Sequence, residues 1–187
     1  MSTAMLSVPV NERDHITGTL DAPVVLVEYG DYECPHCGRA HSIVKAARQR
    51  LGEDLAFVYR HFPLEQIHPN ASLAAQAAEA AGAQGKFWPM HDQLFEHQDA
   101  LEEVDLLVYA RAIHLDVTRF ARDLTAAEHA QKVSDDFRGG VRSGVNGTPT
   151  FFINDVRFDG DWGDAAGFIA VLKQAIRTRP ASGRSGA

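Results

Sequence analysis

Two strands joined by a helix form the most restrictive pattern in this sequence. Val24–Val27 is a continuous apolar run, which is typical of a strand buried on both faces. Leu55–Tyr59 is a second short strand-like run. Between them, apolar residues recur with helical spacing before a plausible stop at Gly52: Ala40, Ile43, Val44, Ala47 and Leu51. Because short links in such a unit make the two strands parallel, we expect their carboxyl ends to lie at one edge of a sheet.

The rest of the chain changes its pattern twice. From about residue 67 to residue 144 the apolar residues keep helical spacing, which we interpret as core packing. Thr150–Ile153 and Val156–Phe158 are then predicted to form a β-hairpin around the tight-turn pair Asn154-Asp155. A closing amphipathic helix follows. This order predicts a small mixed sheet with helices packed on it, and it makes the helical segment an insertion.

The composition is that of an ordinary globular chain. Of the 187 residues, 45% are apolar and 23% are charged, and 18 Lys and Arg against 25 Asp and Glu give a net charge of −7. This acidic balance argues against a non-specific nucleic-acid binder and against an anionic membrane surface. We find neither an export signal nor a run of roughly 20 apolar residues that could span a membrane. We therefore expect a cytoplasmic protein, or an exported one if a signal has been removed.

The only two cysteines lie in Cys34-Pro35-His36-Cys37, and a disulfide-scaffolded fold needs more of them. Cys34 follows a buried strand and opens a helix, where free amides and the positive end of the helix dipole converge. Both favour a thiolate and lower its pKa, and a protonated His36 would add positive charge beside the sulfur. Pro35 suits the first helical turn because it has no amide that needs a partner. The spacing therefore predicts a redox-active dithiol.

Two other interpretations of the cysteine pair stay open. A zinc site could use Cys34 and Cys37 with His36 and His41, although structural zinc usually takes four protein ligands and the chain has no second Cys-x-x-Cys. Alternatively, the cysteines could be incidental to a peptide-binding, chaperone-like module. We interpret the dispersed histidines as ordinary core-edge or surface residues: His61, His68, His91, His97, His114 and His129.

Three features together resemble the thioredoxin superfamily: Cys34-Pro35-His36-Cys37, Glu28 six residues before Cys34, and Thr148-Pro149 ahead of a strand. The helical insertion narrows the resemblance to DsbA-like thiol-disulfide oxidoreductases, and residues 27–37 and 60–64 are similar to the bacterial "thioredoxin-4" type. The resemblance covers roughly residues 15–178. It implies an α/β thioredoxin fold, in which helices flank a central mixed β-sheet, with an inserted α-helical domain.

The patterns along the chain also divide it into expected parts. These are an N-terminal arm (1–22), a thioredoxin-like domain (23–64 and 145–179), an inserted helical domain (65–144) and a flexible tail (180–187).

The role of each site residue follows from the same resemblance. Cys34 would form a mixed disulfide with a substrate cysteine, and Cys37 would resolve it. Glu28, the only acid in its strand, would accept a proton beneath Cys37, unless it reaches solvent at the strand end. Thr148 and a cis Pro149 would position the substrate.

The resemblance implies no metal and no organic cofactor, because the Cys34–Cys37 disulfide is itself the redox group. The expected partners are cysteine-containing protein or peptide substrates and an unidentified redox partner that recycles the protein. Thr148 stands where the oxidases of this family have valine, so the direction of the reaction (oxidation, reduction or isomerisation) stays open.

Overall fold

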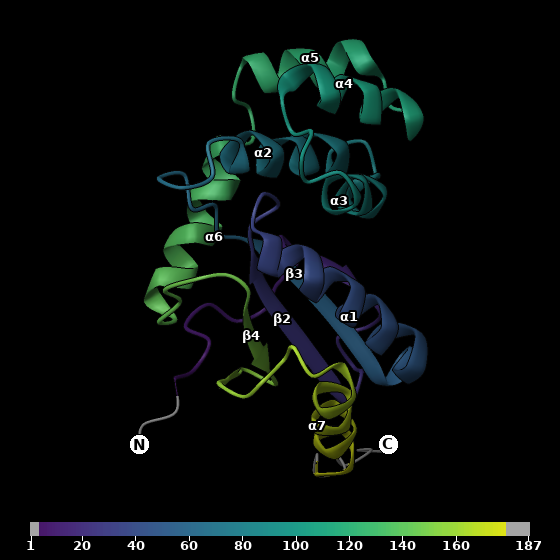
Figure 1. Cartoon of the computed structure of the whole chain (residues 1–187), viewed down its shortest axis with the longest axis vertical. Coiled ribbons are helices and arrows are strands. Elements are labelled where there is room, and N and C mark those ends of the chain that lie inside the picture. The colour runs from purple at the N-terminus through teal and green to yellow at the C-terminus, as the bar shows by residue number, and fades with distance from the viewer. Residues whose placement is uncertain (1–3, 179–187) are drawn as a thin grey trace, which may run out of the picture.

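The computed structural model describes residues 4–178 and contains one five-stranded mixed sheet in the order β1-β3-β2-β4-β5 (Figure 1). The strands are β1 (His15–Thr17), β2 (Val24–Gly30), β3 (Leu55–His61), β4 (Thr150–Ile153) and β5 (Val156–Phe158). The central strand, β2, runs parallel to β3 and antiparallel to β4. The predicted mixed sheet, parallel pair and hairpin are therefore confirmed.

Seven α-helices accompany this sheet in the described part of the chain. Helix α1 (Pro35–Leu51) leads through a short 3-10 turn (Gly52–Asp54) to β3, and α7 (Ala165–Thr178) follows β5. Between β3 and β4 lie α2 (Ala71–Gly82), α3 (Phe87–Glu96), α4 (Glu103–Ala112), α5 (Val117–Thr125) and α6 (Ala130–Arg142). Figure 1 shows α2 to α5 grouped above the sheet, with α6 running down beside it. They occupy the segment predicted as an insertion, whereas the predicted tail at 180–187 lies outside the described residues.

The two faces of the sheet carry separate clusters of buried apolar side chains. Side chains alternate along β2, so Val24 and Leu26 belong to one cluster, and Val27 and Tyr29 to the other. The first cluster includes residues of α1 and α7, which cover that face. Glu28 continues the period of Val24 and Leu26, so its carboxyl group lies on the face that α1 covers.

Within residues 4–22, the segment predicted as an N-terminal arm pairs with the sheet at two places. It contains β1, which pairs antiparallel with β3, and Met5 forms an isolated bridge with Val156 at the opposite edge. Arg60 of β3 holds this segment in place, since its guanidinium donates to both carboxylate oxygens of Asp14 at 2.8 Å and to the carbonyl oxygen of Val8 at 2.8 Å. A three-residue strand is too short to produce an alternating pattern, so the sequence did not indicate it.

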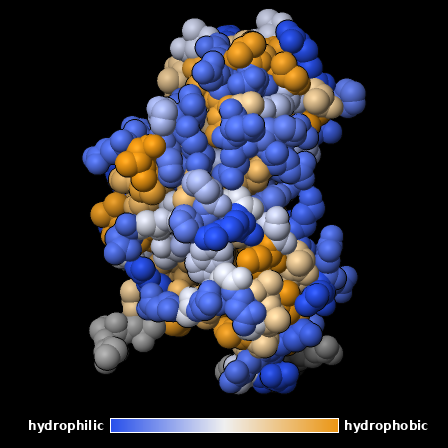
Figure 2. All heavy atoms as spheres, viewed as in Figure 1, coloured by the Kyte–Doolittle hydropathy of each residue, from blue (hydrophilic) through white to orange (hydrophobic). Residues whose placement is uncertain are grey.

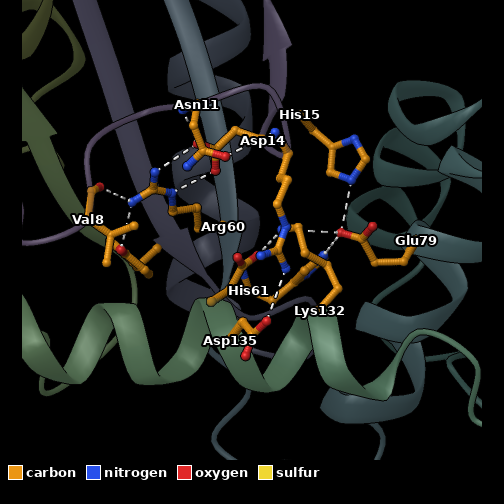
Figure 3. A network of polar contacts seen from close by, with 12 residues as sticks. Val8, Asn11, Asp14, His15, Arg60, His61, Glu79, Lys132 and Asp135 are labelled. Carbon is orange, nitrogen blue, oxygen red and sulfur yellow. Dashed lines mark hydrogen bonds and ion pairs between the residues drawn. The ribbon is translucent and has the colours of Figure 1, made fainter.

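A buried polar network fastens the insertion to the sheet (Figure 3). The Glu79 carboxylate on α2 accepts hydrogen bonds from His15 of β1 at 2.9 Å and from His61 of β3 at 2.8 Å. Lys132 of α6 lies 3.8 Å from the same oxygen. Burial by itself would raise the pKa of Glu79, but the hydrogen bonds from the two histidines outweigh it and lower the pKa. An ionised carboxylate with donors from three other elements therefore links α2 and α6 to the sheet edge.

The surface is mixed in character. Hydrophilic residues cover much of the face in Figure 2, and apolar residues lie in separate patches. None of the helices in residues 4–178 has the length and apolar character needed to cross a membrane.

Candidate active site

Cys34 lies where the turn after β2 becomes α1. Its backbone is extended (φ −75°, ψ 121°) at the N-cap position, and Pro35 begins the helix. The Gly38 amide donates to the Cys34 carbonyl oxygen at 3.1 Å, which closes the first helical turn. The structure therefore places Cys34 at a helix N-terminus, where unpaired amides favour negative charge.

The two thiols are free and differ strongly in acidity. Hydrogen bonding with the Cys37 side chain is the largest effect on Cys34 and lowers the pKa of its thiol to about 5, although burial opposes it. The Cys37 and His36 amides lower this pKa further, and so does the Thr148 side chain when its hydroxyl turns to donate to the thiolate. Cys34 is 4% exposed and Cys37 0%, so both residues are buried.

Cys37 keeps its proton. Burial raises the pKa of the Cys37 thiol well above its usual value, and the hydrogen bond with Cys34 and the negative charge of Glu28 raise it further. The Asp31 amide opposes this weakly, since it donates to Cys37 Sγ at 3.5 Å. At neutral pH the pair therefore consists of a thiolate at Cys34 and a thiol at Cys37.

Glu28 is buried, with 2% exposure, which rules out a solvent-open position at the strand end. Its Oε1 atom has no hydrogen-bond partner among residues 4–178. Burial raises the pKa of Glu28 to about 8, and the negative charge of Cys34 adds to the shift. A carboxyl group with a pKa near neutral pH, close enough to both thiols to sense their charges, is suited to proton transfer.

The loop before β4 brings Thr148 and Pro149 next to Cys34. The peptide bond between these two residues is cis. Cys34 Sγ lies 3.5 Å from the Thr148 carbonyl oxygen, to which the thiol can donate. The Thr148 hydroxyl is buried and lacks a partner within the described part of the chain, so it is free to turn and donate to a thiolate at Cys34.

The side chain of His36 contacts Arg39, and its backbone amide contacts Cys34. The imidazole is exposed, and its Nδ1 atom accepts a hydrogen bond from the Arg39 guanidinium at 2.6 Å. This contact joins the imidazole to Arg39 and not to Cys34, and the effect of a protonated His36 on the sulfur stays a prediction. In the structure, the effect of His36 on the pKa of Cys34 comes from its backbone amide.

Asp31 is a site residue that the sequence pattern did not reveal. Its buried carboxylate accepts three hydrogen bonds at 2.8 Å, from the amides of Glu33 and Leu64 and from His68 Nδ1. These bonds hold the turn before Cys34 against the loop that follows β3. An acid placed directly after a buried strand was the only available signal.

The insertion also reaches the active-site turn. Gln98, which follows α3, donates from Nε2 to the carbonyl oxygens of Tyr32 at 2.7 Å and Cys34 at 2.9 Å. A Cβ atom at Gly38 would lie 2.1 Å from Gln98 Oε1, so only glycine leaves room for this contact. The partners are separated by more than sixty residues, and no local pattern could have paired them.

Several histidines that are dispersed in the sequence gather in space. Two groups lie close enough together to hold a metal ion: His41, His91 and Asp92, and His61, Glu79 and Asp136. Neither contains a cysteine, so both groups, found among residues 4–178, differ from the zinc site considered above. His61 and His91 are core residues, 1% and 3% exposed, which corrects their interpretation as core-edge or surface positions.

Comparison with known proteins decides the family. A family model described as thioredoxin, of the "thioredoxin-4" type, matches residues 10–170. The chain belongs to this thioredoxin family. The predicted resemblance is thereby confirmed.

Solved structures of similar proteins share the fold. BdbD from Bacillus subtilis, in its oxidised form, superimposes with a TM-score of 0.81 at 24% identity over 94% of this chain and 100% of that one. A thioredoxin-like oxidoreductase from Silicibacter pomeroyi DSS-3 gives a TM-score of 0.77 at 28% identity over 89% of this chain and 94% of that one. The predicted thioredoxin fold is therefore confirmed.

Some curated relatives are longer proteins. The Na(+)/H(+) antiporter NhaA 1 of Mycobacterium sp. (strain KMS) is 51% identical over 164 residues, which is 87% of this chain. The NhaA 1 antiporter of Salinispora arenicola (strain CNS-205) is 46% identical over 177 residues, which is 93% of this chain. This chain spans 27% of the length of each relative, so the similarity concerns one region of those proteins.

Proposed function

We propose that the protein is a thiol-disulfide oxidoreductase that exchanges a Cys34–Cys37 disulfide with protein or small-thiol substrates. The observation that carries this proposal is the unequal thiol pair, since the pKa of Cys34 falls to about 5 while that of Cys37 rises. Membership of the thioredoxin family and the likeness to the Silicibacter oxidoreductase support it. The disulfide is the redox group, so the proposal includes no metal and no organic cofactor.

In the reducing direction, the Cys34 thiolate attacks a substrate disulfide. A mixed disulfide forms, and one substrate sulfur leaves as a thiolate. Cys37 then passes its proton to the Glu28 carboxylate and attacks the Cys34 sulfur. The Cys34–Cys37 bond forms, the mixed disulfide breaks, and the second substrate sulfur leaves. The same steps in reverse oxidise a substrate dithiol, with Glu28 returning the proton to Cys37.

Substrate recognition is assigned to the loop that carries the cis peptide bond. The half-buried Thr148 and Pro149 adjoin Cys34, where the Thr148 backbone can pair with an extended substrate segment. The proposed partners are cysteine-containing polypeptides and a separate redox protein that restores the starting state. Sodium–proton exchange, the activity that the names of the curated relatives state, is not part of this proposal.

Trapping of the mixed disulfide tests the proposal. The Cys37→Ser variant should accumulate a covalent adduct at Cys34 with a disulfide-containing peptide, whereas Cys34→Ser should form none. The parent protein should turn over without accumulating the adduct. Full activity of Cys34→Ser would instead favour the chaperone-like alternative, and one equivalent of zinc in the reduced protein would favour the metal-binding one.

The reduction potential of the pair assigns the direction. The reduction potential of thioredoxin is about −270 mV and that of DsbA about −120 mV. We expect an intermediate reduction potential here, because the lowered pKa of Cys34 favours the reduced form only in part. A potential near the oxidising end would favour an oxidase or isomerase, and one near the reducing end would favour a reductase.

A further inference from the structure

A small polar cavity lies beside Glu28, between α1 and α3. Its volume is about 30 Å³, and a cavity of roughly 10–15 Å³ is enough to hold one water molecule. The polar residues that line it come from β2, α1 and α3: Glu28, His41, Lys45, Arg48, His91 and Asp92. Two buried atoms of this lining, Glu28 Oε1 and His41 Nε2, have no hydrogen-bond partner among the described residues. A water molecule in the cavity could satisfy both.

His41 connects this cavity to the surface. Its side chain is 11% exposed, and its Nε2 atom lies 3.4 Å from Oδ1 of Asp92. The Asp92 side chain is 42% exposed and therefore meets bulk water. The cavity, His41 and Asp92 thus form a continuous polar route from the buried Glu28 to solvent.

The surroundings of His41 lower the pKa of its imidazole, so the ring is neutral at neutral pH. Burial is the largest effect and lowers the pKa of His41; Lys45 and Arg48 of α1 act in the same direction, while Asp92 and Glu96 of α3 oppose them.

The neighbouring imidazole of His91 is neutral as well. Burial lowers its pKa far below the usual value, and its Nδ1 atom is engaged with the Tyr32 hydroxyl at 3.1 Å. Of these two rings, it is therefore His41 that has a buried nitrogen without a hydrogen-bond partner among the described residues and that lies next to a carboxylate at the surface.

We propose that the proton which Glu28 exchanges with Cys37 travels to and from solvent through the His41–Asp92 pair. This inference rests on the proposed function of Glu28 as the proton acceptor. Glu28 gives its proton to a water molecule in the cavity, which gives a proton to His41 Nε2; the imidazolium then passes the Nε2 proton to the Asp92 carboxylate, which releases it to solvent. Because α3 supplies Asp92, the helical insertion takes part in the exchange reaction.

The route matters because of the acidity of Glu28. With a pKa of about 8, Glu28 holds a proton at neutral pH and has to lose it before it can accept the one from Cys37. Glu28 is 2% exposed, so its carboxyl group has little direct contact with bulk water. Removing the relay should therefore slow resolution of the mixed disulfide and leave the first attack by Cys34 unchanged.

The test follows the two steps separately in single-turnover kinetics with a peptide disulfide. His41→Gln should leave formation of the mixed disulfide at the parent rate and slow its resolution by about tenfold, somewhat less than the roughly 100-fold or more typical of a direct general base. His97→Gln, which changes an exposed histidine at the end of α3, is the matched control and should match the parent in both steps. In His41→Ala, added imidazole should restore the rate of resolution.

Three outcomes would overturn the inference. His41→Gln could resolve the adduct at the parent rate while Glu28→Gln is slow, which would leave the proposed acceptor in place and remove the route. Resolution in His41→Ala could be slow and unaffected by imidazole, which would mean that the ring only packs. If Glu28→Gln resolved the adduct at the parent rate, the proposed role of Glu28 would fail together with its route.

Discussion

Substitution of Glu28 by Gln should stabilise the protein in a way that depends on pH. Burial raises the pKa of Glu28 from 4.5 to about 8, so the folded state binds this proton more tightly than the unfolded state does. The resulting stability is fully present below pH 4.5 and is lost as the pH rises through the folded pKa of about 8. At 1.36 kcal/mol per pKa unit, the loss reaches about 3 kcal/mol by pH 7.

Glutamine has a similar shape and does not titrate, so it avoids this loss. We expect the two proteins to be nearly equally stable at pH 4. The variant should be more stable by about 3 kcal/mol at pH 7, and for a chain of this length that is a rise in Tm of roughly 6–12 °C. The difference should level off above the pKa of Glu28.

Thermal and urea unfolding of parent and variant at intervals from pH 4 to pH 9 would measure the difference. The series should be run on the disulfide form, because the thiols then do not titrate. Burial alone then shifts the pKa of Glu28, so the difference at pH 7 should be somewhat smaller than the value worked for the reduced protein. On reduction, the added charge of Cys34 should move the profile to higher pH, since that charge is the second cause of the shift. Exposed Glu53 provides the control, because Glu53→Gln should stay within about 0.5 kcal/mol of the parent.

A stability difference of the same size at every pH would refute this reasoning. It would mean that the carboxyl group at position 28 titrates alike in the folded and unfolded states. A variant that became less stable than the parent as the pH rises would refute it more strongly, because the ionised carboxylate would then be favoured by the fold.

Three further predictions concern the active-site turn. Iodoacetamide should label Cys34 before Cys37, with a rate that rises around pH 5, as the lowered pKa of Cys34 requires; faster labelling of Cys37, mapped by mass spectrometry, would reverse their roles. His36→Pro removes the amide that donates to Cys34, so it should raise the pKa of Cys34 and lower the reduction potential. His36→Ala keeps this amide and should change both quantities less; equal effects of the two variants would mean that the imidazole ring itself acts on Cys34. Asp31→Ala leaves the amides of Glu33 and Leu64 unpaired and should lower stability by about 2–4 kcal/mol in urea unfolding, a loss that an unchanged midpoint would contradict.

The sheet and its hairpin could be predicted because their signals are local. β2 and β3 are buried on nearly every residue, and each begins with an apolar run that is visible in the sequence, Val24–Val27 and Leu55–Tyr59. The hairpin turn needs two residues with positive φ, and Asn154 (φ 48°) and Asp155 (φ 67°) are residue types that tolerate this conformation.

The contacts that complete the site could not be predicted because they join distant parts of the chain. His41 of α1 meets Asp92 of α3, and Gln98 meets the turn around Cys34, only after the insertion folds back on the sheet. The position of the insertion is visible as a change in apolar period, but its docking depends on single polar side chains. A single glutamine after a helix, such as Gln98, gives no periodic signal in the sequence from which its distant contact could be predicted.

The low pKa of Cys34 depends on the fold as well as on the Cys-Pro-His-Cys motif. A helix N-terminus stabilises a neighbouring charge by about 0.3–1 kcal/mol, which corresponds to less than about one pKa unit. The pKa of Cys34 falls from 9.0 to about 5, so the helix dipole by itself is insufficient. The largest contribution comes from hydrogen bonding with the Cys37 side chain, and another comes from Thr148, which lies on a loop more than one hundred residues away in sequence. A Cys-Pro-His-Cys segment transplanted to the start of an isolated helix would keep the amides but lose the Thr148 loop and the fold that holds the two sulfurs within hydrogen-bond distance, so its thiol pKa should lie nearer to the ordinary value.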